Sequence, residues 1–444
     1  MQTRLALATL ILLPHLAAAD GITVLTAGKV AVFKNGRGTV RVGRDVQLAA
    51  APSPVCPAAS TVELSSYPEP TQRVIVATTR ALDCTKWKAK RGGFVYDDPA
   101  APGGVRAIRY GKKGLLIRFA GAEFQAPVGP VGYLQAWLTI GGTRFNARFH
   151  NFRRNDARAL VTRKPSEAAA TGERAFWAVL HHDWATEEQR ADLEGVALDC
   201  FTRAKQDRRD GWSRFLLAMT HLYRFGQRVV RYDDVADFAR GEIEAAQAAF
   251  HDALPIVLKG GKGDSRVPGF AAATTFGVGV VHGDAALQAQ GLAELDAAFR
   301  LNPFFNVFDY IPVAQTIPSF DPRFQQVYEK VSGYLNDPDT LQCISTQPEI
   351  CSNAGYAPRN TAGSLALFGD LEAKGGNAPA AKGWYDLALA FGRAGNPPYR
   401  FLAALETRAS TVADRVARFR DADAGNDPTV IGAAQEACAA CHNR

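Results

Sequence analysis

The sequence predicts an α+β protein of several domains, in which an N-terminal antiparallel β-sandwich is followed by an all-α helical domain. Up to about residue 152, apolar residues alternate with polar ones, which is typical of half-buried strands. From about residue 168, apolar residues recur at spacings of three and four, which is typical of amphipathic helices. A chain of 444 residues has room for about three domains.

Residues 1–19 have the pattern of a secretory signal peptide. Arg4 gives a short positive region, residues 5–16 are mostly apolar, and three alanines precede Asp20. We therefore expect cleavage after residue 19 and export, to the periplasm or to the outside of the cell. The apolar stretch is too short for a membrane anchor, and no later stretch has the length of a transmembrane helix.

Residues 20–155 are expected to form the β-sandwich. Residues 134–140 and 144–149 alternate on either side of Gly141 and Gly142. This predicts a hairpin whose two-residue turn needs positive φ, which glycine adopts without strain. Residues 39–42 and 73–76 are further predicted strands, and residues 111–114 separate two more. Many short strands separated by glycine and proline are typical of a β-sandwich.

The stretch that holds Cys84, Trp87 and residues 93–98 resembles a β-module of secreted bacterial proteins. The resemblance implies no particular activity.

Residues 168–397 are expected to form a helical domain, and residues 398–444 to form further C-terminal helices. Two segments carry small and large residues at the spacing of paired antiparallel helices. They are Gly279, Gly291, Leu295, Ala298 and Pro303 in the first segment, and Gly369, Ala381, Tyr385 and Ala388 in the second. Small residues let two helices approach closely, a large residue fills the space between them, and proline ends the pair.

This spacing resembles the tetratricopeptide repeat, whose unit has about 34 residues. The resemblance implies a docking surface for a protein partner. It has two departures: the distance between the segments is not a multiple of the repeat, and His282 stands where an aromatic residue is common. An unrelated helical bundle is the alternative interpretation.

The seven cysteines separate into a C-terminal pair and five others. Those five are Cys56, Cys84, Cys200, Cys343 and Cys351. Because export leads to an oxidising compartment, we expect disulfides between Cys56 and Cys84 and between Cys343 and Cys351, although other pairings are open. Cys200 lies in a predicted helix and is expected to be a buried, unreactive thiol.

The C-terminal pair belongs to the sequence Cys438-Ala439-Ala440-Cys441-His442. Two thiols at this spacing can each form a thioether with a haem vinyl group, and the adjacent histidine can bind the iron. The motif resembles the haem attachment site of c-type cytochromes. Its place near the C-terminus is similar to that in class II cytochromes of the cytochrome c′ group. The resemblance implies one covalent haem c, with His442 as the proximal ligand.

Two other chemistries are open for this pair. One is a disulfide or redox pair of Cys438 and Cys441, which normally needs a βαβ context that the sequence does not show. The other is a zinc site, which would need a second pair of ligands.

The distal iron ligand is left open. The candidates are Met219, His221 and His282, beside His150, His181, His182 and His251. A methionine among leucines in a helix is more often a core residue than a ligand. The class II resemblance favours a five-coordinate iron, which could bind a small gas, whereas a filled position would restrict the haem to electron transfer.

The charge pattern is mild. A net charge of +7 over 444 residues weakly favours acidic partners and gives no reason to expect nucleic-acid binding. The densest basic stretch is Arg144, Arg148, Arg153, Arg154, Arg158, Arg163 and Lys164. We interpret it as the solvated face of a strand that continues into a linker. Residues 259–264 are glycine-rich and basic but lack the spacing of a phosphate loop, so we expect an exposed loop.

These observations predict an exported monohaem c-type cytochrome that transfers electrons or senses through its haem, with a helical-repeat surface for a protein partner. One alternative is a non-redox tetratricopeptide-like scaffold. Another is a haem enzyme that acts on peroxide or nitrogen oxides. We expect an electron carrier or binding protein rather than an enzyme.

Overall fold

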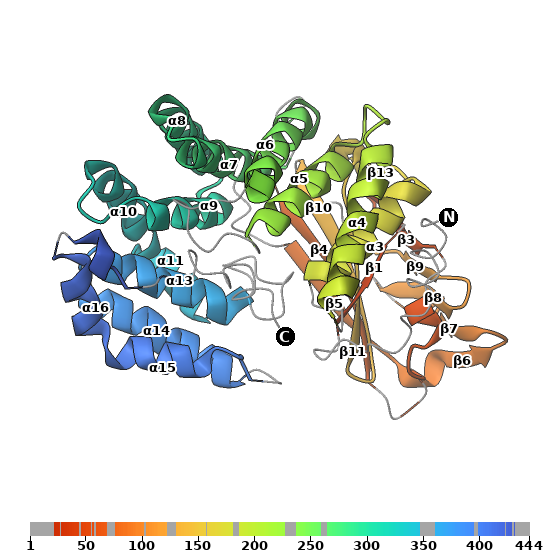
Figure 1. Ribbon diagram of the computed structural model, residues 1–444. Coiled ribbons are helices and arrows are strands. Elements are labelled where there is room, and N and C mark those ends of the chain that lie inside the picture. The colour runs from red at the N-terminus through yellow and green to blue at the C-terminus, as the bar shows by residue number, and fades with distance from the viewer. Residues whose placement is uncertain are drawn as a thin grey trace. The chain divides into compact units, whose positions relative to one another are not determined.

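The computed structural model (Figure 1) shows an α+β protein, as the sequence predicts. It describes residues 22–26, 28–43, 46–54, 56, 59–68, 76–101, 104–121, 130–156, 158–180, 186–226, 237–258, 264–346, 360–394, 398–421, 423–428 and 430. The contacts of the chain divide it into two compact units. Unit 1 is Met1–Val179, Asp183–Leu217 and Asp252–Asp264, and unit 2 is Leu180–His182, Ala218–His251 and Ser265–Arg444.

The first sheet of unit 1 has five strands. Their order is β1 (Ile22–Leu25), β11 (Thr143–Phe149), β10 (Val131–Ile140), β4 (Ser60–Pro68) and β5 (Val76–Leu82). Strands β1 and β11 are parallel, and the other neighbours are antiparallel. The predicted hairpin is confirmed: Ile140 pairs with Thr143, and Gly141 and Gly142 have φ of 54° and 86°. Of the strand expected at residues 73–76, only Val76 lies within the described residues.

The second sheet has eight strands, and all neighbouring pairs are antiparallel. Their order is β12 (Phe152–Asp156), β13 (Ala159–Thr162), β2 (Gly28–Phe33), β3 (Gly38–Val42), β9 (Leu115–Phe119), β8 (Val105–Gly111), β7 (Gly93–Asp97) and β6 (Trp87–Lys90). The strand predicted at residues 39–42 lies in β3, and residues 112–114 connect β8 to β9 as expected. The strands continue to Thr162, into the stretch that we interpreted as a linker.

One core lies between the two sheets and makes them a sandwich. Leu134, Leu138 and Ile140 of β10 belong to it, together with apolar residues of β2, β3, β8 and β9. The alternate residues of β10 face the opposite way and are buried as well, with Tyr133 fully inaccessible. Helix α3 (Glu167–Leu180) packs on the same face at β11, where the Arg148 guanidinium lies 4.1 Å from the centre of the Trp177 ring.

Two further helices follow α3 along the chain, α4 (Glu187–Ala204) and α5 (Gly211–Gly226). Phe176, Leu193 and Ala197 are buried, which confirms the predicted helical spacing. Cys200 of α4 is a free, buried thiol, and burial raises its pKa. The prediction of a buried thiol at this position is therefore confirmed.

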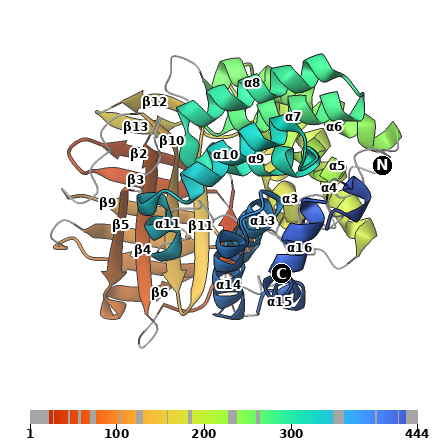
Figure 2. The ribbon, with the colours of Figure 1, turned by 90° about the vertical axis from the view of Figure 1, so that its left-hand side faces the viewer.

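Unit 2 is helical. Its helices are α6 (Asp237–Val257, which reaches unit 1 at Asp252), α7 (Val267–Val281), α8 (Ala285–Leu301), α9 (Pro303–Thr316), α10 (Pro322–Leu335), α11 (Pro338–Thr346), α13 (Asn360–Lys374), α14 (Ala378–Ala394), α15 (Leu402–Ser410) and α16 (Val412–Phe419). Helices α13 to α16 gather at the C-terminal end (Figure 2). None of the described helices has both the length and the apolarity to cross a membrane.

The two segments with the predicted small-residue spacing both form helical hairpins. Helices α7 and α8 are joined by three residues, and so are α13 and α14. A Cβ at Gly291 of α8 would lie 2.5 Å from the Phe276 nitrogen of α7, and a Cβ at Gly369 of α13 would lie 2.5 Å from the Tyr385 ring of α14. These glycines are therefore required by close helix contact, which is the reason given for them in the sequence analysis.

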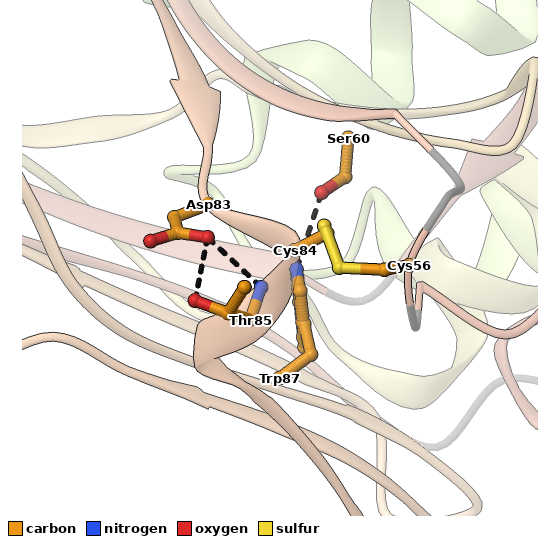
Figure 3. The surroundings of a disulfide bond; sticks show 6 residues. All are labelled: Cys56, Ser60, Asp83, Cys84, Thr85 and Trp87. Atoms are coloured by element: carbon orange, nitrogen blue, oxygen red, sulfur yellow. Dashed lines mark hydrogen bonds between the residues drawn. A yellow bond between two sulfur atoms is a disulfide. The ribbon is translucent and has the colours of Figure 1, made fainter.

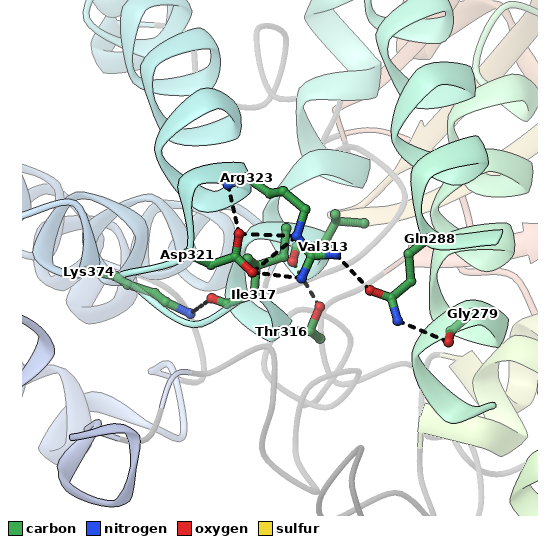
Figure 4. A network of polar contacts seen from close by, with 8 residues as sticks. All are labelled: Gly279, Gln288, Val313, Thr316, Ile317, Asp321, Arg323 and Lys374. Carbon is green, nitrogen blue, oxygen red and sulfur yellow. Dashed lines mark hydrogen bonds and ion pairs between the residues drawn. The ribbon is translucent and has the colours of Figure 1, made fainter. Parts of the chain in front are cut away.

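Polar contacts join the first hairpin to the start of α10 (Figure 4). The Gln288 side chain donates to the Gly279 carbonyl at 3.1 Å and accepts from the Arg323 guanidinium at 2.9 Å. Asp321 in turn forms an ion pair with Arg323 at 2.7 Å and accepts from its backbone nitrogen at 2.8 Å. Gln288 thus closes α7 on α8 and holds the next helical layer to them.

Candidate functional site

The residues of the predicted haem site, Cys438, Cys441 and His442, lie outside the described residues. Residues 259–263 of the expected loop and Cys351 also lie outside them, as do His181 and His182. Cys343 of α11 is disulfide-bonded, so it does not remain a free thiol. Within the part of the chain that the structure describes, no group of three or more His, Cys, Asp or Glu side chains could hold a metal ion.

The candidate distal ligands occupy two places in unit 2. Met219 and His221 lie in α5, where the His221 Nδ1 atom is 2.7 Å from Glu242 of α6. His282 follows α7 and lies 2.6 Å from Glu244. A carboxylate behind a histidine is also found at metal sites, where it orients the ring, so these pairs leave both histidines as candidates.

One expectation about these residues is wrong. The repeat resemblance places His282 at a core position, but its side chain is 37% exposed, because α7 ends at Val281 and the ring reaches out to Glu244. Met219, which we interpret as more often a core residue than a ligand, is half-buried. Its immediate neighbours Leu217 and Ala218 take the buried positions of the helix.

The disulfide between Cys56 and Cys84 is confirmed (Figure 3). It joins two positions separated by 28 residues. Asp83 accepts from the Thr85 backbone nitrogen at 2.9 Å and so caps the short turn that presents Cys84. Next to it, the Trp87 indole donates to the Ser60 hydroxyl at 3.1 Å. The bond ties the start of β4 to the end of β5, and we assign it a structural role.

Unit 1 contains a cavity of about 180 Å³ that the sequence did not reveal. It is lined by residues 148–151, where β11 ends, by residues 163–166, which precede α3, by Glu173 of α3, and by the chain between Arg203 and Trp212. All of these segments belong to unit 1. Arg148, Arg163 and Lys164 come from the basic stretch of the sequence, and Arg148 is only 7% exposed. Our interpretation of this stretch as a solvated face is wrong at Arg148, because α3 covers the strand there.

Asn151 connects the segments that line the cavity through hydrogen bonds. Its φ is 54°, the only positive φ of a residue other than glycine in the described chain, and asparagine tolerates this conformation better than most residues do. Its amide donates to Asp210 at 2.7 Å and accepts from the Trp212 backbone nitrogen at 3.2 Å. The backbone carbonyl of Asn151 accepts a hydrogen bond from the backbone nitrogen of Arg163 at 3.1 Å. One residue therefore holds three of the segments that line the cavity.

Two helices begin at the cavity. Ser166 accepts from the Ala169 nitrogen at 3.0 Å and caps α3. Asp210 accepts from the backbone nitrogen and the hydroxyl of Ser213, at 2.9 and 2.7 Å, and caps α5. Helix N-termini carry partial positive charge, so both capped ends add to the positive potential of the lining.

Glu173 of α3 is the lining residue whose carboxyl group is held by two indoles. The indoles of Trp177 and Trp212 donate to the same oxygen of its carboxyl, at 3.3 and 3.5 Å. Burial raises the pKa of Glu173 to about 7, although both indoles and the nearby Arg148 act to lower it. The His150 ring stacks on Trp212 with 3.4 Å between ring centres. The cavity thus contains a carboxyl group whose charge changes near neutral pH.

The remaining charges lie toward the solvent. Arg203 pairs with Asp199 at 2.7 Å, and Arg209 lies 3.6 Å from Asp207. Arg163 and Lys164 are exposed, and no side-chain hydrogen bond or ion pair holds either of them within the described residues. The lining therefore offers two uncommitted cations near two helix N-termini.

Comparison with models of protein families, with curated proteins and with solved structures finds no match for this chain.

Sequence reasoning missed this cavity for a physical reason. Its segments are brought together by contacts of Asn151 with residues about sixty positions away, and no local pattern predicts such contacts. The only sequence signal was the density of basic residues between Arg144 and Lys164.

Proposed function

We propose that this chain is an exported monohaem c-type cytochrome that transfers electrons or senses through its haem. The observation that carries the proposal is the sequence Cys438-Ala439-Ala440-Cys441-His442. Cys438 and Cys441 would hold the haem as thioethers, and His442 would bind the iron. When bound, the haem supplies one-electron chemistry.

The other cysteines support this proposal. Cys56 is paired with Cys84, and Cys343 is also disulfide-bonded. Disulfides are typical of exported proteins, and c-type haem is attached in the same compartment. Cys200 is buried, and burial raises the pKa of its thiol, so we expect it not to compete for the haem vinyl groups.

The test is a pyridine haemochrome spectrum of protein that is co-expressed with a c-type maturation system. We expect haem to remain on the wild-type chain through denaturing gel electrophoresis and to be absent from Cys438→Ala/Cys441→Ala. Cys200→Ala is the matched control, because it removes a buried cysteine of α4 outside the motif, and it should retain the haem. A wild-type chain without covalent haem, made beside a correctly matured reference cytochrome, would overturn the proposal.

A second candidate is a docking scaffold, favoured by the two glycine-dependent hairpins α7–α8 and α13–α14. Antiparallel helix pairs of this kind present extended surfaces to protein partners. The two functions are compatible, since the hairpins could dock the redox partner of the haem. Reversible binding of a redox protein that is retained in Cys438→Ala/Cys441→Ala would assign docking to the helical unit alone.

For the haem itself we propose a five-coordinate iron, as the class II resemblance implies. The ferrous protein should then bind carbon monoxide with a shifted Soret band. Turnover of peroxide or nitrogen oxides by the purified protein would favour an enzyme instead. An unchanged Soret band after carbon monoxide addition would indicate a sixth ligand, to be sought among Met219, His221 and His282.

A further inference from the structure

The cavity of unit 1 has the features of a built ligand site. Its lining combines the end of β11, the starts of α3 and α5 and the end of α4 with the segments that connect them, so it is formed by several parts of the chain rather than by one loop. Its polar side chains are held by specific contacts: Asn151 by Asp210, and Glu173 by Trp177 and Trp212. Clefts with a few positioned polar groups and a titratable residue of shifted pKa are the usual places for small ligands.

The charges of the lining favour an anion. Five basic side chains line the cavity: Arg148, Arg163, Lys164, Arg203 and Arg209. Three acidic side chains line it: Glu173, Asp207 and Asp210. Asp207 lies beside Arg209, Arg203 pairs with Asp199 outside the lining, and Asp210 caps α5. Arg163 and Lys164 are therefore the lining cations that no side-chain carboxylate holds among the described residues. The backbone donors at the starts of α3 and α5 are capped within the protein, and the helix dipoles add partial positive charge, which favours carboxylate and phosphate groups.

The rest of the lining favours an organic anion over an inorganic one. Phe149, Pro165, Ala204 and the Trp212 ring give the cavity apolar wall. The Glu173 carboxyl would repel a dense anion such as phosphate when ionised, and when protonated it can donate one hydrogen bond to a ligand oxygen. A volume of about 180 Å³ suits a molecule of a few carbon atoms.

We propose that this cavity binds a small organic acid as its carboxylate. Arg163 and Lys164 attract and pair with the carboxylate, with support from the dipole of α3, which starts after Ser166. The body of the acid lies against Trp212, and a polar atom of the ligand accepts a hydrogen bond from Glu173. This inference is independent of the haem proposal, because every residue it uses belongs to unit 1.

The carboxyl of Glu173 makes the binding depend on pH. The groups that face it are the indoles of Trp177 and Trp212, the Arg148 guanidinium of β11 and the Asp210 carboxylate before α5. The other charged or titratable lining groups are His150, Arg163, Lys164, Arg203, Asp207 and Arg209. Ionisation of Glu173 adds a negative charge and removes a donor, so carboxylate binding should weaken as the pH rises through about 7.

The first experiment is isothermal titration calorimetry of the full-length exported protein at pH 6. Lactate and benzoate serve as organic acids of two sizes, and inorganic phosphate serves as the comparison. We expect saturable binding of at least one of the two organic acids, with affinity weakened about tenfold in Arg163→Gln/Lys164→Gln. Both residues are exposed, so this variant should fold normally, which circular dichroism would verify.

The matched control is Arg109→Gln/Lys112→Gln. It removes the same charge from exposed positions of unit 1 that do not line the cavity, and it should bind the acid as the wild type does. An equal loss in this control would show a general charge effect and overturn the site. Saturable binding of phosphate alone would overturn the organic acid, and no saturable binding of either acid up to roughly 10 mM would overturn the proposal.

The second experiment compares Glu173→Gln with the wild type between pH 6 and pH 8. Glutamine keeps the shape and a hydrogen-bond donor but does not titrate. We expect acid binding to weaken with rising pH in the wild type and to change much less in Glu173→Gln. An identical pH profile in both proteins would remove Glu173 from the proposed site.

Discussion

The pKa of Glu173 is set by opposing effects of its surroundings. The protein around it removes water and raises its pKa to about 7, whereas two indole donors and Arg148 act in the opposite direction. Because the first effect is larger, the folded protein keeps a proton on Glu173 at pH values where an exposed glutamate, with a pKa of about 4.3, has lost it. The charge of this residue is therefore linked to folding.

Glu173→Gln should stabilise the protein more at pH 8 than at pH 5. Between about pH 4.3 and 7 the folded state holds a proton that the unfolded state releases, so the wild-type free energy of unfolding falls as pH rises through this range. The difference between variant and wild type should grow by on the order of 2 kcal/mol. Urea unfolding at both pH values measures it, and an equal difference at the two would contradict the assignment.

Lys374 ends helix α13 with its ammonium group inside the protein. It is 4% exposed, and its Nζ donates to the carbonyls of Ala314, Gln315 and Ile317 at 3.2, 2.9 and 2.7 Å. Figure 4 shows the contact with Ile317. These carbonyls belong to the end of α9, where backbone acceptors lack helical partners. One lysine thus satisfies the end of a neighbouring helix.

Lys374→Ala should lower the free energy of unfolding by about 2–3 kcal/mol, because buried carbonyls lose a charged donor. The matched control is Lys382→Ala, which removes an exposed lysine paired with Asp386 on α14. It should change stability by no more than about 0.5 kcal/mol. Chemical denaturation of the three proteins side by side makes the comparison, and similar losses in both variants would rule out the capping role.

Between elements, the closest contact of the first hairpin is at Gly291. Replacing it with alanine would place a Cβ 2.5 Å from the Phe276 backbone, which forces α7 and α8 apart. We expect Gly291→Ala to cost about 1–3 kcal/mol. Gly383→Ala in α14 is the control, because nothing lies within 4 Å of its Cβ position, and it should gain about 0.5–1 kcal/mol from helix propensity. A stabilised Gly291→Ala would refute close packing in this hairpin.

The sequence predicted elements whose signals are local and missed those that depend on distant partners. The β10–β11 hairpin was predictable because Gly141 and Gly142 set the turn and the alternation set the register. Both helical hairpins were predictable from their small residues. Strand β13 was not, because residues 159–162 pair with β2, more than a hundred positions earlier. Burial of Arg148 was missed because alternation identifies two faces but does not say that a helix covers the second.

For the whole molecule, two separate cores lie in two units. The core of the sandwich belongs to unit 1, and the largest helical core belongs to unit 2. Cores of this size can unfold independently. We therefore expect calorimetry to resolve two transitions, and variants in one unit should shift one of them.

Removal of the Cys56–Cys84 disulfide tests this division. The bond closes a separation of 28 residues, for which loop entropy predicts a loss of about 3–4 kcal/mol. Cys56→Ser/Cys84→Ser should lower the transition of unit 1 and leave the transition of unit 2 in place, whereas Gly291→Ala should do the reverse. A single transition that shifts in both variants would show that the units unfold together.

The two candidate sites of the molecule differ in how much of each can be predicted from the sequence. The proposed haem motif is contained in five consecutive residues, so the proposal follows from the sequence alone. The cavity of unit 1 depends on Asn151 meeting Asp210 and Trp212 across the fold, and only the structure assembles it. The end of helix α4 lines the cavity. The sequence predicted the helix, but it did not predict that the helix lines a cavity.

Strand β10 is buried on both faces, and the sandwich core lies on one of them. In a sheet with one face in solvent, every second residue of a strand can be replaced at little cost. Of the ten residues of β10, nine are buried, so almost every substitution in this strand should disturb packing. Among homologues of this chain, residues 131–140 should therefore vary least.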